Sequence, residues 1–184
     1  FSVAANGDEA FVLGEALQTV ARVPFVGADR PIGTAGTGRW LAAVGRATDR
    51  EDMARHVHAG ELADLSGLLQ SKPLAGVRVH VAHAPATALA LADLVKELGG
   101  HVTSITLDHV DRLHLDTLRA LATRDPDVVV HVGDGQAFEE VNLLSRQPVD
   151  LYAGAGLHVA QIARTGRPVL FLPRVPLAGY AGVR

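Results

Sequence analysis

The sequence predicts an α/β fold, a Rossmann-like three-layer sandwich in which helices cover both faces of a parallel sheet. Between Val77 and Leu172, short β-branched or apolar runs alternate with amphipathic stretches of helix length, the pattern that parallel βαβ units produce. Breakers such as Gly99-Gly100 and Pro126 separate these runs. The chain of 184 residues is 48% hydrophobic and 20% charged, a composition that suits a compact domain with a buried core.

The elements before residue 77 follow a different pattern. Residues 8–21 are predicted to form a helix and residues 24–27 a strand without partner strands, so we interpret residues 1–30 as the tail of a preceding Rossmann-like domain. Pro31-Ile32-Gly33-Thr34 predicts a turn and a helix cap. Two helices over residues 34–47 and 50–70 follow, and we interpret residues 31–76 as helices that link two domains.

The main domain is predicted to cover residues 77–184 and to be truncated at its C-terminal end. Its five strands are expected at residues 77–82, 101–107, 127–132, 149–153 and 168–172. Its helices are expected at residues 86–98, 113–123, 136–146 and 157–165. Strand, helix and strand recur at the spacing of right-handed βαβ units.

Charge and composition argue against several classes of partner and site. A formal net charge of -3 gives no general attraction for nucleic acid. No apolar run approaches the roughly 20 residues of a membrane-spanning helix, and residues 1–5 lack the features of a secretory signal, so a cytoplasmic protein without a membrane partner is predicted. The absence of cysteine excludes disulfides, thiolate catalysis and cysteine-ligated zinc or iron–sulfur clusters within these residues.

A ligand of such a sheet is expected beyond the carboxyl ends of the strands, where helix N-termini present free N–H groups. Gly154-Ala155-Gly156 either lets a ligand approach the backbone or forms only a tight turn, and Asp134 either accepts a hydrogen bond from a ligand or caps the next helix. Four arginines and no acidic residue follow Leu151, which predicts either an anion-binding end or a solvated basic surface. The residues predicted to bind a cofactor are Gly133, Asp134, Gly154, Gly156, His158 and Arg174.

The nine histidines do not predict a metal site. His83, His109 and His158 all fall on the predicted rim, but none belongs to a helical His-x-x-x-His pair with an adjacent glutamate. His80 and His131 lie within strands, where a hydrogen-bonded core histidine is expected. No Gly-x-Ser-x-Gly elbow, Walker loop or paired-carboxylate signature is present, so the residues alone indicate no catalytic group.

The order of several short motifs resembles the nitrogenase component 1-type oxidoreductases, which include nitrogenase subunits, cofactor-assembly scaffolds and dark-operative protochlorophyllide reductases. Pro31-Ile32-Gly33-Thr34, followed by the segment up to Leu41, is similar to the family's connection from the second domain to the third. The later motifs, in the family's order, are residues 72–79, 148–154, 166–170 and 179–182. The Pro-Ile-Gly-Thr form is more similar to the β-type than to the α-type subunits.

This resemblance implies a subunit of three Rossmann-like domains, of which the chain holds the end of the second and most of the third. It also implies an iron–sulfur or iron–molybdenum-type cluster in the parent assembly, a homologous α-type subunit as partner, and an iron protein that delivers electrons. No cluster ligand is expected within this chain, because the family's ligating cysteines lie largely in the first domain. The loop between Leu172 and Gly179 is shorter than in the family's nitrogenases, and it lacks the cofactor-binding histidine of the α-type subunits.

Two alternatives remain open at this stage. Residues 150–161 and 166–173 are also similar to the nucleotide-sugar half of a GT-B-type glycosyltransferase, in which a helix N-terminus holds a diphosphate. Such enzymes usually carry a glutamate where Gln161 stands, and they do not account for residues 31–41. The second alternative is a Rossmann-like interaction module without chemistry of its own. In the preferred interpretation, the parent protein is an oxidoreductase or a cofactor scaffold, and these residues alone are not catalytic.

Overall fold

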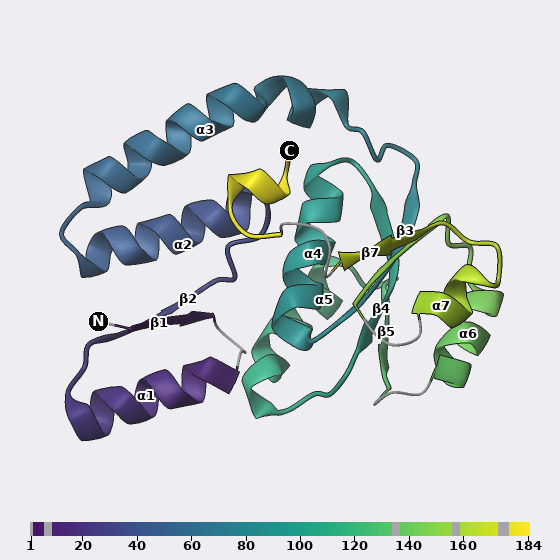
Figure 1. Ribbon diagram of the computed structural model, residues 1–184, viewed down its shortest axis with the longest axis horizontal. Coiled ribbons are helices and arrows are strands. Elements are labelled where there is room, and N and C mark those ends of the chain that lie inside the picture. The colour runs from purple at the N-terminus through teal and green to yellow at the C-terminus, as the bar shows by residue number, and fades with distance from the viewer. Residues whose placement is uncertain (1, 6–8, 134–136, 156–158, 173–176) are drawn as a thin grey trace.

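A five-stranded parallel sheet forms the centre of the computed structural model, which describes residues 2–5, 9–133, 137–155, 159–172 and 177–184 (Figure 1). The strand order is β5-β4-β3-β6-β7, and all neighbouring strands run parallel. The strands are β3 (Arg78–His83), β4 (His101–Leu107), β5 (Val129–Val132), β6 (Leu151–Gly154) and β7 (Val169–Phe171). The predicted α/β fold with a parallel sheet is therefore confirmed.

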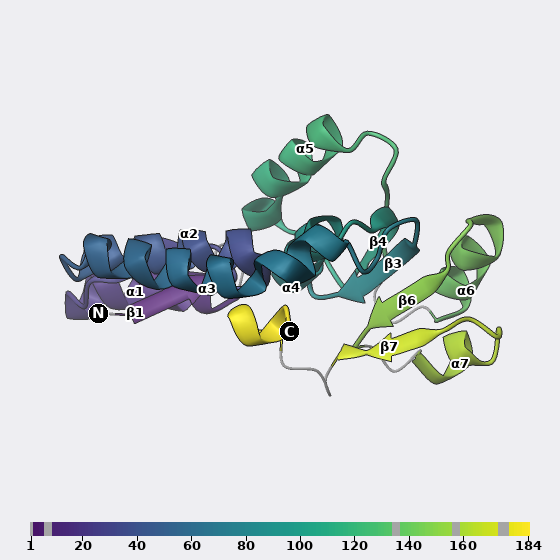
Figure 2. The ribbon, with the colours of Figure 1, turned by 90° about the horizontal axis from the view of Figure 1, so that it is seen from above.

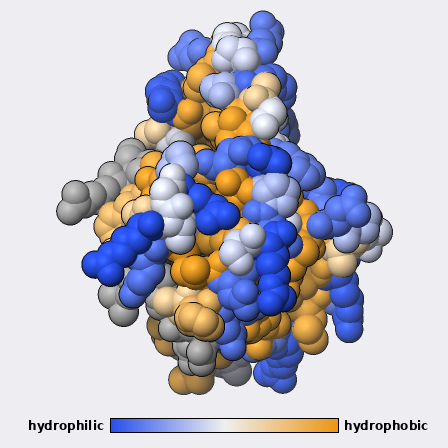
Figure 3. Space-filling view, turned by 90° about the vertical axis from the view of Figure 1, so that its right-hand side faces the viewer, coloured by the Kyte–Doolittle hydropathy of each residue, from blue (hydrophilic) through white to orange (hydrophobic). Residues whose placement is uncertain are grey.

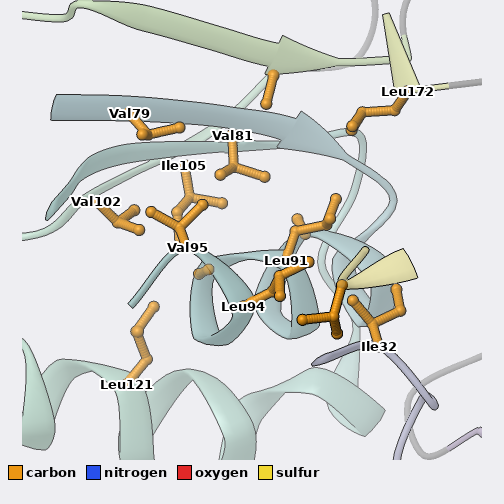
Figure 4. Close-up of a cluster of buried hydrophobic side chains, with 14 of the residues drawn as sticks. Ile32, Val79, Val81, Leu91, Leu94, Val95, Val102, Ile105, Leu121 and Leu172 are labelled. Carbon is orange, nitrogen blue, oxygen red and sulfur yellow. The ribbon is translucent and has the colours of Figure 1, made fainter. Parts of the chain in front are cut away.

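Helices cover both faces of this sheet, as the sequence predicts. α4 (Pro85–Glu97) and α5 (Leu115–Arg124) lie on one side, and α6 (Ala137–Arg146) and α7 (Val159–Ala163) lie on the other (Figure 1). Because successive strand residues point to opposite faces, each strand contributes to two separate cores. The larger core packs α4 against β3 and β4 (Figure 4) and includes Val79, Val81, Leu91, Val95 and Ile105.

The other face of the sheet carries a smaller and more polar core. Its apolar residues are Ala82, Leu144, Val149, Tyr152 and Ile162. His80, Ser104 and Thr106 are also buried in the structure. Polar side chains on strand residues therefore alternate with the valines and isoleucine that face α4.

The first residues form a small βαβ unit, which corrects one prediction. β1 (Ser2–Ala5) pairs in parallel with β2 (Phe25–Ala28), and α1 (Glu9–Ala21) connects them. The strand near residue 25 was predicted to have no partner strand, and this prediction was wrong. A run of only four residues, Ser-Val-Ala-Ala, is too short to show the alternation that identifies a strand.

Two long helices, α2 (Gly33–Ala47) and α3 (Glu51–Ser71), pack side by side, and α2 lies between α3 and the small unit (Figure 1). α2 contacts β2 on one side and α4 on the other. The short helix η3 (Tyr180–Gly182) returns to the same helices, where the Tyr180 hydroxyl and His58 Nδ1 form a hydrogen bond. Ile32 and Gly179 also form an isolated parallel bridge. The C-terminal residues therefore pack on α2 and α3 (Figure 2).

The N-terminus of α2 is capped by a residue that is distant in sequence. Ile32 occupies the cap position and provides no side-chain cap. The Glu97 carboxylate instead accepts the backbone N–H groups of Thr34 at 2.7 Å and Ala35 at 2.9 Å, and the Thr34 hydroxyl at 2.9 Å. The sequence predicted a local cap, whereas the negative charge at the positive end of the helix comes from the last residue of α4.

Within the described ranges, no helix combines the length and the apolar character that a membrane span requires.

Candidate functional site

The candidate site is a cavity of about 460 Å³ near the carboxyl ends of the strands. β3 is the central strand, and β4 and β6 lie on its two sides, so the strand order reverses direction here. Open α/β sheets bind ligands at such a reversal. The residues that line the cavity are Arg30, Pro31, Ile32, His83, Thr87, Leu172, Leu177 and Ala178.

Thr87, in the first turn of α4, is one of the residues that line this cavity. The residue is only 3% exposed. Among the described residues, nothing forms a hydrogen bond with its Oγ1 atom. Leaving a buried hydroxyl without a partner costs about 1–3 kcal/mol. This cost makes Thr87 a candidate for a ligand-binding group.

His83, the last residue of β3, is the titratable group of the site. Its Nδ1 atom accepts the backbone N–H of Ala84 at 2.8 Å, which places the proton of the neutral ring on Nε2. Burial lowers the pKa of His83, the nearby Arg30 lowers it further, and Asp108 opposes the shift. At neutral pH the ring is therefore uncharged and has one N–H to donate.

The lining as a whole combines hydrogen-bond donors with apolar surface. His83 Nε2, the Thr87 hydroxyl and the Arg30 guanidinium can all donate, and Arg30 adds positive charge. Ile32, Leu172 and Leu177 supply apolar surface. This combination suits an organic ligand with an anionic oxygen group, such as a carboxylate.

The structure gives two of the predicted site residues a packing explanation. A Cβ atom on Gly154 would lie 2.5 Å from the Tyr152 ring, and one on Gly133 would lie 2.5 Å from the His131 ring. Neither glycine lines the cavity. Asp134, Gly156, His158 and Arg174 lie outside the described residues. Arg174 stands in sequence between Leu172 and Leu177, which both line the cavity. Ligand binding by all six residues stays a prediction.

The arginines and histidines that were also candidates for the site have different roles in the structure. Arg167 donates to the Leu144 carbonyl oxygen at 2.8 Å, and Arg184 forms an ion pair with Glu61 at 2.8 Å. These two members of the predicted basic end therefore have partners within the chain. Of the rim histidines, His83 lines the cavity, whereas His109 belongs to a separate cluster.

His80 is a hydrogen-bonded core histidine, as predicted. Its Nδ1 atom lies 2.7 Å from Ser104 Oγ, and its Nε2 atom lies 3.2 Å from both Glu140 Oε1 and Thr106 Oγ1. The Tyr152 hydroxyl donates to Glu140 Oε2 at 3.1 Å, and its ring stacks on the imidazole. This network could not be predicted from the sequence, because Glu140 lies in a helix 60 residues away from His80.

The residues Arg30 and Pro31 were also missed as part of the site. They precede α2; Arg30 was interpreted as the end of a preceding domain, and Pro31 as the start of the helices that link two domains. The motif Pro31-Ile32-Gly33-Thr34 indicated a turn at this point of the chain. Nothing in the sequence placed that turn at the carboxyl edge of the sheet.

Comparison with known proteins identifies the family. The sequence profile described as nitrogenase component 1 type oxidoreductase matches residues 3–184. The solved structure "Nitrogenase Cp1 at pH 6.5" superposes with a TM-score of 0.83 and 20% identity, over 98% of this chain and 42% of that chain. "Nitrogenase Cp1 at pH 5" gives a TM-score of 0.75 and 15% identity, over 94% of this chain and 42% of that chain. No curated protein matches the chain.

These comparisons carry different weight. The two solved structures show the shared fold, and the chain spans 42% of the length of each nitrogenase chain that it matches. The family profile covers nearly every residue, including both the small βαβ unit and the large sheet. It does not support the glycosyltransferase alternative. The chain belongs to the nitrogenase component 1-type oxidoreductase family.

Proposed function

We propose that this chain is part of a nitrogenase component 1-like oxidoreductase subunit, of the nitrogenase, cofactor-assembly scaffold or protochlorophyllide reductase type. In the parent assembly it supplies structure, a surface for partner docking and one wall of a cofactor or substrate pocket. The observation that carries the proposal is the cavity at the carboxyl edge of a sheet whose family is established. The Pro-Ile-Gly-Thr motif favours a β-type subunit.

The residues of the wall fit the organic or acidic part of a ligand. Iron–sulfur clusters are held mainly by cysteine thiolates, and this chain has no cysteine. An iron–sulfur or iron–molybdenum-type cluster therefore takes its thiolate ligands from other parts of the assembly. The role of this chain is to bind and orient through Thr87, His83 and Arg30, and to exclude water with the apolar lining. Catalysis by these residues alone is not expected.

Partner docking is supported by apolar side chains at the edges of the sheet. Val130 and Val132 on the edge strand β5, and Leu170 and Phe171 on the edge strand β7, are all more than a third exposed, and Phe138 on α6 is 82% exposed. Figure 3, viewed from the side that carries α6 and α7, shows apolar side chains lying between charged ones. We propose that such surface is covered by a homologous α-type subunit, with an iron protein as electron donor, in the cytoplasm.

The substitution Thr87→Val tests the proposed wall. Valine has nearly the shape of threonine and removes the hydroxyl that has no partner among the described residues. We expect the free energy of unfolding to stay equal or to rise by about 1 kcal/mol. We expect the assembled protein to lose about tenfold or more of its reductase activity or cofactor occupancy, because a donor to the ligand is gone.

Thr37→Val is the matched control for this substitution. Thr37 is also buried, but its hydroxyl donates to the Gly33 carbonyl oxygen at 2.6 Å and it does not line the cavity. This variant should lose about 1 kcal/mol of stability and keep its activity once folded. Full activity and full cofactor occupancy in Thr87→Val would contradict the proposed role of the wall.

A further inference from the structure

A second group of ligand-type side chains lies in the segment after β4, outside the cavity. His109, Asp111 and His114 each place one nitrogen or oxygen atom within 4.8 Å of the other two. They form the sequence pattern His-x-Asp-x-x-His. Asp111 precedes the short helix η1 (Arg112–His114), whose last residue is the buried His114. None of these three residues lines the cavity of the proposed function.

The contacts of His114 Nδ1 bring two hydrogen-bond acceptors together. This nitrogen accepts the backbone N–H of Asp111 at 3.1 Å, so it carries a lone pair and no proton. Asp111 Oδ1 lies 3.1 Å from the same nitrogen and accepts the backbone N–H of Leu113 at 2.8 Å. A protonated Nδ1 would satisfy the carboxylate but would leave the N–H of Asp111 without this acceptor. Both atoms accept backbone N–H groups in a capping box at the start of η1. A metal ion bound at Nδ1 would replace the N–H of Asp111 there, because an imidazole nitrogen has one lone pair.

His109 completes a three-sided set of donors. Its ring lies edge-on to the His114 ring, with centroids 5.4 Å apart and planes at 74°. The His109 side chain is exposed, and so is half of the Asp111 side chain, so an ion reaches the group from solvent. Two imidazoles and one carboxylate are ligands that suit first-row divalent transition metals, and three protein ligands leave coordination positions for water.

We propose that His109, Asp111 and His114 bind a divalent transition metal ion of the Zn²⁺ class. The site takes a single ion on nitrogen and oxygen ligands, so it differs in chemistry from a cysteine-ligated cluster. It does not depend on the proposed function of the cavity. No metal ligands were predicted from the sequence because no rim histidine belongs to a helical histidine pair, whereas these ligands come from a loop and a short helix.

The test is a calorimetric Zn²⁺ titration of the purified protein after treatment with a chelator. We expect the wild-type protein to bind Zn²⁺ at this site, and the exposed substitution His109→Ala to weaken that binding by about tenfold or more. Co²⁺ used as a second probe should give visible d–d bands in the wild type that are lost in His109→Ala. His114 is buried, so its replacement is a poorer test than the exposed His109.

His56→Ala is the matched control, because His56 is an exposed imidazole on α3 that is not part of the group. This variant should bind Zn²⁺ as the wild type does. The proposal is overturned if the wild type takes up no Zn²⁺, or if His109→Ala and His56→Ala bind it equally well. Neither result would bear on the activity test of Thr87→Val, so the two proposals fail separately.

Discussion

Gly33 shows how a single residue without a side chain determines the start of a helix. Its φ angle is +70°, a conformation that costs other residues free energy, and a Cβ atom would lie 3.0 Å from the Glu97 carboxylate. The carboxylate that caps α2 therefore occupies space that only glycine leaves open. The glycine of the Pro-Ile-Gly-Thr turn thus has a physical cause within this chain.

Gly33→Ala should lower the free energy of unfolding by about 1–3 kcal/mol, because it strains the backbone and displaces the cap. Urea denaturation of the purified protein measures the effect. Gly60→Ala is the control, since Gly60 lies within α3 and nothing lies within 4 Å of an added Cβ atom. That variant should gain about 0.5–1 kcal/mol. Equal effects of the two substitutions would contradict this account of Gly33.

His83 links the cavity to pH. Burial and Arg30 lower its pKa, so between the lowered value and the ordinary value of about 6.5 the unfolded chain binds a proton that the folded chain does not. The neutral His83 ring therefore contributes fully to the free energy of unfolding above about pH 6.5. This contribution is lost as the pH falls from about 6.5 through the lowered pKa.

In His83→Gln, the fall in the urea midpoint between about pH 7 and pH 5 should be smaller than in the wild type. His101→Gln, at an exposed position that begins β4, should leave the pH dependence as it is. The carboxylate of Asp150, whose pKa is held low by hydrogen bonds from Arg78, titrates at lower pH and does not overlap this window. An unchanged slope in His83→Gln would show that the ring does not titrate as described.

The two glycines of the predicted rim show what the sequence could and could not reveal about single residues. Gly133 and Gly154 were recognised as glycines at strand ends, and ligand approach was one of two explanations. In each case the ring two residues earlier, of His131 or Tyr152, occupies the space that a Cβ atom on the glycine would need. Side chains at i and i+2 share one face of a strand. That spacing was visible in the sequence. The hydroxyl of Thr87 gave no such signal, because its lack of a partner depends on the packed structure.

At the scale of elements, α6 is attached to the sheet by a charged residue in an otherwise buried layer. Glu140 is 2% exposed, and its carboxylate contacts His80 on β3 and Tyr152 on β6. Burial raises the pKa of Glu140, but the hydrogen bonds from His80, Tyr152 and Thr106 and the charge of His80 outweigh it, so the net shift is downward. The carboxylate thus stays ionised and holds one helix against three strands.

Glu140→Ala should destabilise the protein by about 3–5 kcal/mol, because it leaves buried polar groups on His80 and Tyr152 without this partner. Glu140→Gln keeps an acceptor and should cost less. The neighbouring Glu139 is the matched control, since its side chain is 58% exposed and Glu139→Ala should change stability by no more than about 0.5 kcal/mol. Chemical denaturation that gives similar values for Glu140→Ala and Glu139→Ala would contradict the role of the network.

Most elements of the large sheet could be predicted from the sequence because the alternation of apolar runs and breakers is strong. The strand predicted at residues 101–107 matches β4, and the helix predicted at residues 34–47 differs from α2 by one residue. The network on the opposite face was signalled only by the polar residues His80, Ser104 and Thr106 among valines and isoleucine. Their shared partner on α6 could not be identified, because sequence periodicity does not show which helix covers which strands.

At the scale of the whole molecule, the sheet order places the cavity. The chain runs from β3 through β4 to the edge strand β5 and then crosses to β6 and β7, so the loops diverge beside β3. The sequence predicted that the loops after the strands share one rim, which is where His83 and Leu172 lie. It did not predict that Arg30 and Pro31 close the same cavity, because their place depends on the packing of α2 against α4.

We propose that this cavity belongs to a nitrogenase component 1-like assembly. The most direct measurement is the iron and acid-labile sulfide content of the protein, purified anaerobically together with its homologous partner subunit, combined with its visible absorption spectrum. We expect iron, sulfide and cluster absorption in the co-purified complex. A metal-free monomer whose melting temperature rises with a nucleotide-sugar would contradict it.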